Sequence, residues 1–121
     1  MQRRVAFLGL GVMGYPMAGW LSKRGYAVVV YNRTHAVSQR WLRDYVGEAA
    51  ATVAEAVAGA EIVFTCLGND DDVRAVVAGE TGALAAMSSG SVLVDHTTTS
   101  ALVARELAEQ AEALGLGFID A

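Results

Sequence analysis

Cysteine, proline and lysine are scarce in this chain of 121 residues, which contains one of each: Cys66, Pro16 and Lys23. A single cysteine excludes an internal disulfide and a metal site built from several thiolates of this chain, and it favours a reducing compartment. No uninterrupted apolar run approaches the roughly 18 residues of a membrane-spanning helix, and the first residues lack the pattern of a secretory signal. We therefore expect a cytoplasmic protein that does not associate with a membrane.

Basic residues are too few and too scattered to form a nucleic-acid-binding surface. Nine Lys and Arg stand against 13 Asp and Glu, and the formal net charge of −4 repels phosphate backbones. Hydrophobic residues make up 54% of the chain and charged residues 18%, which is enough apolar surface for one domain of this length to fold. We expect a single domain over residues 1–121 that binds no nucleic acid.

Short apolar runs alternate with segments of helical period, which is the pattern of repeated βα units and a parallel sheet. The runs are rich in β-branched residues and almost continuously apolar, as strands covered on both faces must be. The sequence therefore predicts an α/β fold of the Rossmann type, a doubly wound and mainly parallel sheet with helices on both faces. The expected strands are residues 5–8, 27–31, 61–67, 91–95 and 117–119, with a weaker one at 48–51.

Helices are expected between these strands, where apolar residues recur at helical spacing and glycines follow as stops. Thr34 is a candidate cap for the second helix, and Thr52 with Glu55 forms a capping box for a short third one. We expect Trp20 and Trp41 to lie in the core. The apolar stripes are Met13, Met17, Trp20 and Leu21 before Gly25; Val37, Trp41 and Tyr45 before Gly47; and Val103, Leu107 and Leu114 before Gly115.

The most informative segment runs from a strand straight into Gly9-Leu10-Gly11-Val12-Met13-Gly14 and then into a helix. In a dinucleotide-binding unit Gly9 permits the tight turn, Gly11 lets the backbone approach the pyrophosphate, and Gly14 lets helix and strand pack closely. The phosphates then lie against free N–H groups at the positive end of the helix dipole. The alternative is that the glycines serve packing alone, but their place between strand and helix favours a cofactor site.

The end of the second predicted strand reads Tyr31-Asn32-Arg33-Thr34 and lacks the acidic residue with which NAD enzymes commonly bind the ribose. Asn32 can bond the ribose without repelling a 2′-phosphate. Arg33 can stack on adenine and pair with that phosphate, and Thr34 can donate its hydroxyl and its backbone N–H. The sequence therefore predicts NADP as the cofactor. A methyltransferase is disfavoured, because it also needs an acidic residue here.

With these residues placed, the sequence resembles the β-hydroxyacid dehydrogenase family, which includes 3-hydroxyisobutyrate dehydrogenase and tartronate semialdehyde reductase. The segments that carry the resemblance are residues 7–18, Tyr31 to Thr34, Cys66 to Val73 and Asp95 to Ser100. The resemblance implies that Leu67, Gly68 and Asn69 line the adenosine and pyrophosphate side of the cofactor, that Val73 packs toward adenine and that Thr98 hydrogen-bonds near the nicotinamide. Gly68 departs from the proline that is usual in the family.

Each of these loops also has a structural interpretation. Asp70, Asp71 and Asp72 are expected to supply a cap and favourable charge at a helix start rather than a metal site. The threonines before Ser100 are candidate caps for the last helix. Cys66 reads as a small buried hydrophobe and not as an activated thiolate, and His35 and His96 as surface or loop residues.

The family continues beyond the last residues of this chain into a substrate loop and a helical domain that carries the catalytic lysine. Lys23 is expected on the first helix, away from the cofactor edge, so we expect the chain to bind a dinucleotide but to hold no catalytic residue. The resemblance implies a complete enzyme that transfers hydride between NADP(H) and a small β-hydroxyacid or semialdehyde. An imine reductase and a noncatalytic NADP-binding module remain alternatives. Exposed apolar surface predicts self-association, and we expect a homo-oligomer.

Overall fold

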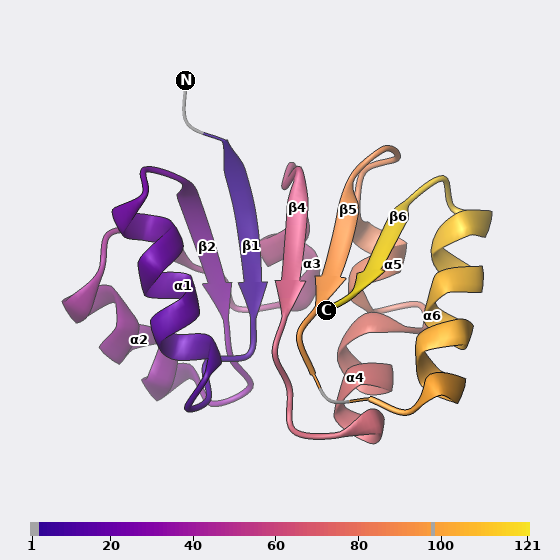
Figure 1. Cartoon of the computed structure of the whole chain (residues 1–121). Helices are drawn as coiled ribbons and strands as arrows, with labels where there is room; N and C mark the ends of the chain where they lie inside the picture. The colour runs from indigo at the N-terminus through magenta and orange to yellow at the C-terminus, as the bar shows by residue number, and fades with distance from the viewer. Residues whose placement is uncertain (1–2, 98) are drawn as a thin grey trace.

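One parallel sheet of six strands forms the centre of the structure, a computed structural model that describes residues 3–97 and 99–121 (Figure 1). The strand order is β3-β2-β1-β4-β5-β6, so the chain winds outward from β1 to β3 and then returns to place β4 on the other side of β1. The predicted α/β fold with a doubly wound parallel sheet is confirmed. The strands are β1 (Arg4–Leu8), β2 (Ala27–Tyr31), β3 (Glu48–Ala49), β4 (Ile62–Thr65), β5 (Val92–Asp95) and β6 (Gly117–Asp120).

Helices cover both faces of this sheet because successive strand residues point to opposite sides. Ala6 and Leu8 of β1 pack with one group of helices, α3 to α6, whereas Val5 and Phe7 pack against α1 and α2. Figure 1 shows α1 in front of the sheet and α3 and α5 behind it. The helices are α1 (Gly14–Lys23), α2 (His35–Asp44), α3 (Val53–Val57), α4 (Asp70–Val77), α5 (Ala83–Ala86) and α6 (Ala101–Ala113). None of the helices in the described ranges has the length and apolar character to cross a membrane.

The packing of α1 corrects one prediction, because Trp20 is 58% exposed and does not lie in the core. The residues that α1 buries are small: Gly14, Ala18 and Gly19. They let the helix approach its neighbours closely, and a side chain on Gly19 would collide with the ring of Tyr45. Of the predicted stripe, Met17 and Leu21 are half-buried and pack at the edge of the core, whereas Met13 and Trp20 are exposed. The guanidinium of Arg24 lies 5.0 Å from the centre of the Trp20 ring. The other tryptophan, Trp41, is fully buried as predicted.

The end of α6 corrects a second prediction. Leu114, expected in the apolar stripe, follows the last helical residue and is 50% exposed. Gly115 turns the chain with φ +72°, a backbone conformation that favours glycine, and Leu116 is the residue that reaches the core. Other elements differ from the prediction as well. Strand β4 ends at Thr65 rather than at residue 67, and the four-residue helix α5 was not predicted.

Side-chain caps begin three of the helices. Thr52 accepts from the N–H of Glu55 at 3.1 Å, as the capping box predicts, although the Glu55 carboxylate bonds the N–H of Ala51 instead of that of Thr52. Asn69, and not one of the aspartates after it, caps α4. Ser100 caps α6 through the N–H of Val103. Thr34 occupies the cap position of α2, but its side chain makes no capping hydrogen bond.

Leu107 in the middle of α6 and Leu114 just after its end provide a matched test of this packing. Leu107→Ala should lower the free energy of unfolding by about 2–5 kcal/mol, because Leu107 is buried in the core and the substitution leaves a cavity. Leu114→Ala removes the same atoms from an exposed position and should cost less than about 1 kcal/mol. Urea unfolding of both variants measures the difference, and equal losses would contradict the burial described here.

Candidate functional site

Four loops meet at the lower edge of the sheet in Figure 1, where the carboxyl ends of β1, β2, β4 and β5 lie side by side. Leu8 pairs with Tyr31 on one side and with Thr65 on the other, and Thr65 pairs with Asp95. The loops that follow, residues 9–13, 32–34, 66–69 and 96–100, therefore start at adjacent positions. The strand order reverses between β1 and β4, which is where ligands of open α/β sheets bind.

The three glycines of the first loop have three different surroundings. Gly9 adopts φ +102°, and a Cβ there would collide with the carbonyl oxygen of Cys66. A Cβ on Gly14 would collide with the carbonyl oxygen of Gly9, so the start of α1 crosses the end of β1 at very short range. A Cβ on Gly11 would meet no atom within 4 Å. Gly9 and Gly14 are thus required by contacts inside the protein, whereas Gly11 borders open space.

The amides of this loop divide into two groups. The N–H of Gly9 donates to the carbonyl of Tyr31, and the N–H of Leu10 donates to Oδ1 of Asn32, both at 2.9 Å. The amides of the next four residues, Gly11 to Gly14, have no acceptor among the described residues. The first turn of α1 has no acidic residue and its N-cap position has no side-chain bond. The positive end of the helix is therefore available to an anion.

Asn32 braces the loop after β2 against the glycine loop. Its Oδ1 accepts from the N–H of Leu10, and its Nδ2 donates to the carbonyl of Thr34 at 3.1 Å. The sequence indicated Asn32 as a ribose ligand but not this structural role. Beside it the Arg33 side chain is 88% exposed, and its Nη1 lies 4.0 Å from Oδ1 of Asp72 on α4. The hydroxyl of Thr34 is not used in capping α2.

A buried carboxylate ties together the loops after β4 and β5. Oδ1 of Asp95 accepts from the hydroxyl of Thr65 at 2.7 Å and from the N–H of Thr97 at 3.0 Å. The hydroxyl of Thr97 in turn accepts from the N–H of Leu67 at 2.8 Å. This network was not predicted. The sequence does contain a signal for it: two otherwise apolar strands end in the polar residues Thr65 and Asp95. Parallel pairing of β4 and β5 sets these two residues opposite each other.

Cys66 and His96 lie beside this network without forming a nucleophilic pair. Burial, and to a lesser degree the negative charge of Asp95, raise the pKa of the Cys66 thiol above its ordinary value, so the thiol stays protonated at neutral pH. The ring of His96 stacks on Phe64 with 6.1 Å between ring centres. Among residues 3–97 and 99–121, no three His, Cys, Asp or Glu side chains converge as a metal site would require.

The start of α4 presents the remaining predicted residues. Leu67 is half-buried, whereas Gly68 and Asn69 are exposed at the loop surface. Val73 is fully buried in the core, so the expected contact with adenine has no accessible surface to use. Thr98 lies outside the described residues. Asp70 accepts a hydrogen bond from the N–H of Ser100 at 2.9 Å, and hydrogen bonds from Ser100 lower the pKa of this carboxyl.

Comparisons with known proteins agree with this arrangement. Residues 4–121 match a family described as the NAD binding domain of 6-phosphogluconate dehydrogenase. An uncharacterized oxidoreductase of Shewanella frigidimarina is 56% identical over 118 residues, which make up 98% of this chain and 40% of that protein. The chain therefore spans well under half the length of this curated relative.

Two solved structures share the fold over almost the whole chain. The 3-hydroxyisobutyrate dehydrogenase of Mycobacterium tuberculosis, solved with L-serine, superposes with a TM-score of 0.87 at 32% identity, covering 98% of this chain and 39% of that one. Psf3 in complex with NADP+ and 2-OPP superposes with a TM-score of 0.89 at 26% identity, covering 96% of this chain and 41% of that one.

The different surroundings of Gly11 and Gly14 lead to a test of the loop. Gly14→Ala should lower the free energy of unfolding by about 1–3 kcal/mol, because the new methyl group would collide with the Gly9 carbonyl. Gly11→Ala should change it by less than about 0.5 kcal/mol, because the methyl group enters open space. Chemical denaturation distinguishes the two, and a Gly14→Ala variant as stable as the parent would show that α1 and β1 do not cross this closely.

Proposed function

The chain belongs to the family of the NAD binding domain of 6-phosphogluconate dehydrogenase, and from this premise we propose that it binds NADP(H) as the cofactor half of a β-hydroxyacid or semialdehyde oxidoreductase. The predicted resemblance to 3-hydroxyisobutyrate dehydrogenases is confirmed by the comparisons. The observation that carries the proposal is the run of amides from Gly11 to Gly14 at the switch point of the sheet: they have no acceptor among the described residues, and Gly11 borders open space.

The pyrophosphate of the cofactor is assigned to this run of amides. Each free N–H at a helix start is a hydrogen-bond donor, and the helix dipole adds a partial positive charge at the same end. The open space beside Gly11 admits the phosphates close to the backbone, whereas Val12, which is almost fully exposed, leaves the loop surface accessible. The free amides and the open space beside Gly11 support this assignment.

A preference for NADP over NAD rests on the loop after β2. Arg33 is free in solvent except for its pairing with Asp72, and its guanidinium can turn to the 2′-phosphate. Asn32 is neutral, and its hydrogen bonds to Leu10 and Thr34 hold it at the loop junction without adding negative charge. Thr34 keeps an unused hydroxyl beside them. A hydrogen bond to a charged group contributes about 1.5–3 kcal/mol, or roughly ten- to a hundredfold in affinity.

The cofactor contacts proposed for this chain come from all four loops. They involve backbone amides of the first loop, side chains of the second, and loop surfaces after β4 and β5. The proposed residues are Gly9, Leu10, Gly11, Val12, Met13, Gly14, Asn32, Arg33, Thr34, Leu67, Gly68, Asn69 and Thr98. Leu10 contributes by position alone, since its side chain is buried and its amide already bonds Asn32.

The bound cofactor supplies hydride for the reduction of a carbonyl group, or accepts it in the reverse direction. A proton donor for the resulting alkoxide is not assigned to this chain. Lys23, the only lysine in the sequence, ends α1 at the edge of the sheet opposite the cofactor loops, with its ammonium 5.6 Å from the ring centre of Tyr45. We assign the donor and the selection of substrate to the part of the relatives that this chain does not span.

Location and assembly are part of the same proposal. The single cysteine supports a cytoplasmic protein. Large apolar side chains such as Trp20 and Ile119 stand exposed on the described surface, which supports a homo-oligomer in the complete enzyme. The names of relatives such as 3-hydroxyisobutyrate dehydrogenase support a small hydroxyacid or semialdehyde as the substrate class.

Titration with NADPH and NADH tests the choice of cofactor. The parent chain should bind NADPH at least about tenfold more tightly than NADH, and Arg33→Ala should remove most of that difference while leaving the NADH affinity within about twofold. Arg43→Ala is the matched control, since Arg43 lies in the last turn of α2, away from the cofactor loops. Equal affinities in the parent would reject NADP as the preferred cofactor.

Gly11→Ala tests the proposed position of the pyrophosphate. A methyl group at this position would occupy the space assigned to the phosphates, so both nucleotides should bind about tenfold more weakly although the fold is retained. Calorimetric titration of the folded variant measures the loss. Unchanged affinity for both nucleotides would place the pyrophosphate elsewhere.

A further inference from the structure

An ion pair joins the loop after β2 to the start of α4, beside the proposed cofactor site. Arg33 follows β2 and Asp72 belongs to α4, which follows β4, so the two side chains come from opposite sides of the β1 glycine loop. The Nη1 of Arg33 lies 4.0 Å from Oδ1 of Asp72. The guanidinium to which we assign the 2′-phosphate therefore already faces a carboxylate of this chain.

Local contacts hold Asp72 at the start of α4, where its carboxylate faces Arg33. The backbone N–H of Asp72 is bonded to the cap Asn69 at 2.9 Å, which fixes the residue in the first turn of α4. A Cβ on Gly68 would lie only 2.9 Å from Oδ2 of Asp72, so the absence of a side chain at position 68 makes room for this carboxylate against the loop. The Asp72 side chain is only 35% exposed.

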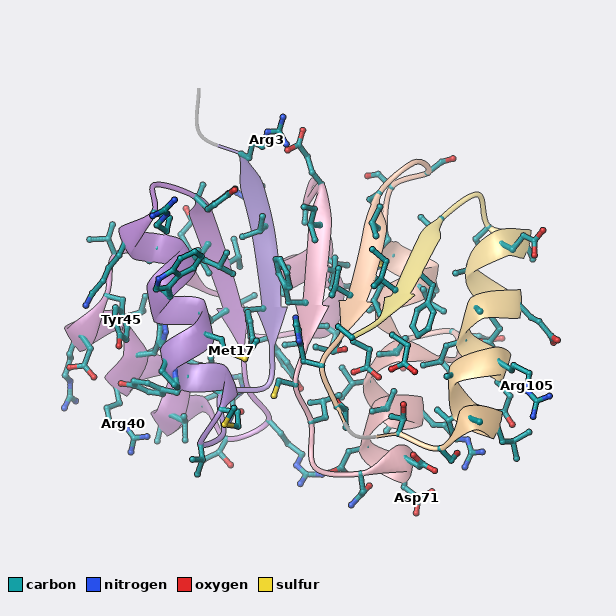
Figure 2. All side chains as sticks on the ribbon, in the orientation of Figure 1. Arg3, Met17, Arg40, Tyr45, Asp71 and Arg105 are labelled. Carbon is teal, nitrogen blue, oxygen red and sulfur yellow. The ribbon has the colours of Figure 1, made fainter. Side chains whose placement is uncertain are left out.

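The two neighbouring aspartates are directed elsewhere. Asp71 is 94% exposed and pairs with Arg74 on the same helix at 3.7 Å. Figure 2 shows Asp71 at the lower edge of the molecule, pointing outward. Asp70 is bound to the N–H of Ser100, in the loop before α6. Among the three acidic residues that begin α4, Asp72 is the one that the structure pairs with Arg33.

We propose that Asp72 is a specificity-determining residue that weakens the discrimination between phosphorylated and unphosphorylated dinucleotides by competing for Arg33. The inference rests on the proposed function. A 2′-phosphate has to displace Asp72 from the guanidinium and then lie near its negative charge, whereas an unphosphorylated ribose meets neither cost. Removing the carboxylate should therefore favour NADPH more than NADH.

The size of the effect follows from the exposure of the pair. Arg33 is mostly in solvent, where ion pairs are weak and salt screens them, so the competition is small compared with the binding of the phosphate itself. We expect a change of about three- to tenfold in the ratio of the two affinities at low ionic strength, and a smaller change at high salt.

Asp72→Asn, with Asp71→Asn as the matched control, tests the inference. Both substitutions remove one negative charge from the first turn of α4, and both preserve the size of the side chain. Calorimetric titration of the folded chains with NADPH and with NADH at low salt gives the ratio of dissociation constants. The ratio should shift toward NADPH about three- to tenfold in Asp72→Asn and by less than about twofold in Asp71→Asn.

The outcomes separate this inference from the proposed function. A parent chain that binds neither nucleotide would reject the proposed function. A parent that binds NADPH but shows the same ratio as Asp72→Asn, or an equal shift in Asp71→Asn, would overturn the role of Asp72 and leave the proposed function intact. In an Arg33→Ala background, Asp72→Asn should change the ratio by less than about twofold, and an undiminished change there would overturn the competition for Arg33.

Discussion

The close crossing of β1 and α1 is the contact on which the rest of the structure depends. Gly14 lies against the carbonyl of Gly9, and neither position has room for a side chain. This crossing sets the start of α1 at the carboxyl edge of the sheet, so the amides that lack an acceptor among the described residues lie at the switch point. It also accounts for the small residues, such as Ala18, that α1 turns toward its neighbours. The same close approach that packs the helix therefore also positions the amides to which we assign the phosphates.

Two polar side chains, Asn32 and Asp95, hold the loops on either side of the β1 loop in place. Asn32 bonds the amide of Leu10 and the carbonyl of Thr34 at once, which an aspartate could not do because it has no N–H to donate. On the other side of β1, Asp95 joins Thr65 and Thr97 and thereby fixes the loop at Leu67. The neutral Asn32 lies beside Arg33, to which we assign the 2′-phosphate, and a carboxylate in place of Asn32 would repel that phosphate. The carboxylate of Asp95 is buried in the network between β4 and β5, on the other side of β1 from Asn32.

The sequence predicted what depends on local pattern and missed what depends on tertiary contact. The strands were found because buried parallel strands are continuous apolar runs, and the glycine loop because strand, turn and helix follow one another directly. Trp20 was placed in the core because periodicity cannot reveal that small residues, rather than large ones, face a closely approaching sheet. Val73 was assigned to the site by resemblance, although its side chain packs in the core. The Asp95 network required the register of two strands that are distant in the sequence.

At the acidic start of α4, the negative charge of Asp72 stabilises the helix and, by our proposal, weakens the binding of a phosphorylated cofactor. Negative charge in the first turn stabilises a helix by about 0.3–1 kcal/mol per residue, so all three aspartates favour the helix. Asp70 accepts a hydrogen bond from the N–H of Ser100, and Asp71 forms an ion pair with Arg74 on the same helix. Asp72 alone among them reaches across to Arg33, so its charge stabilises α4 at the expense of the guanidinium that would receive a phosphate. Gly68 leaves room for this carboxylate, because a Cβ at position 68 would lie 2.9 Å from Oδ2 of Asp72.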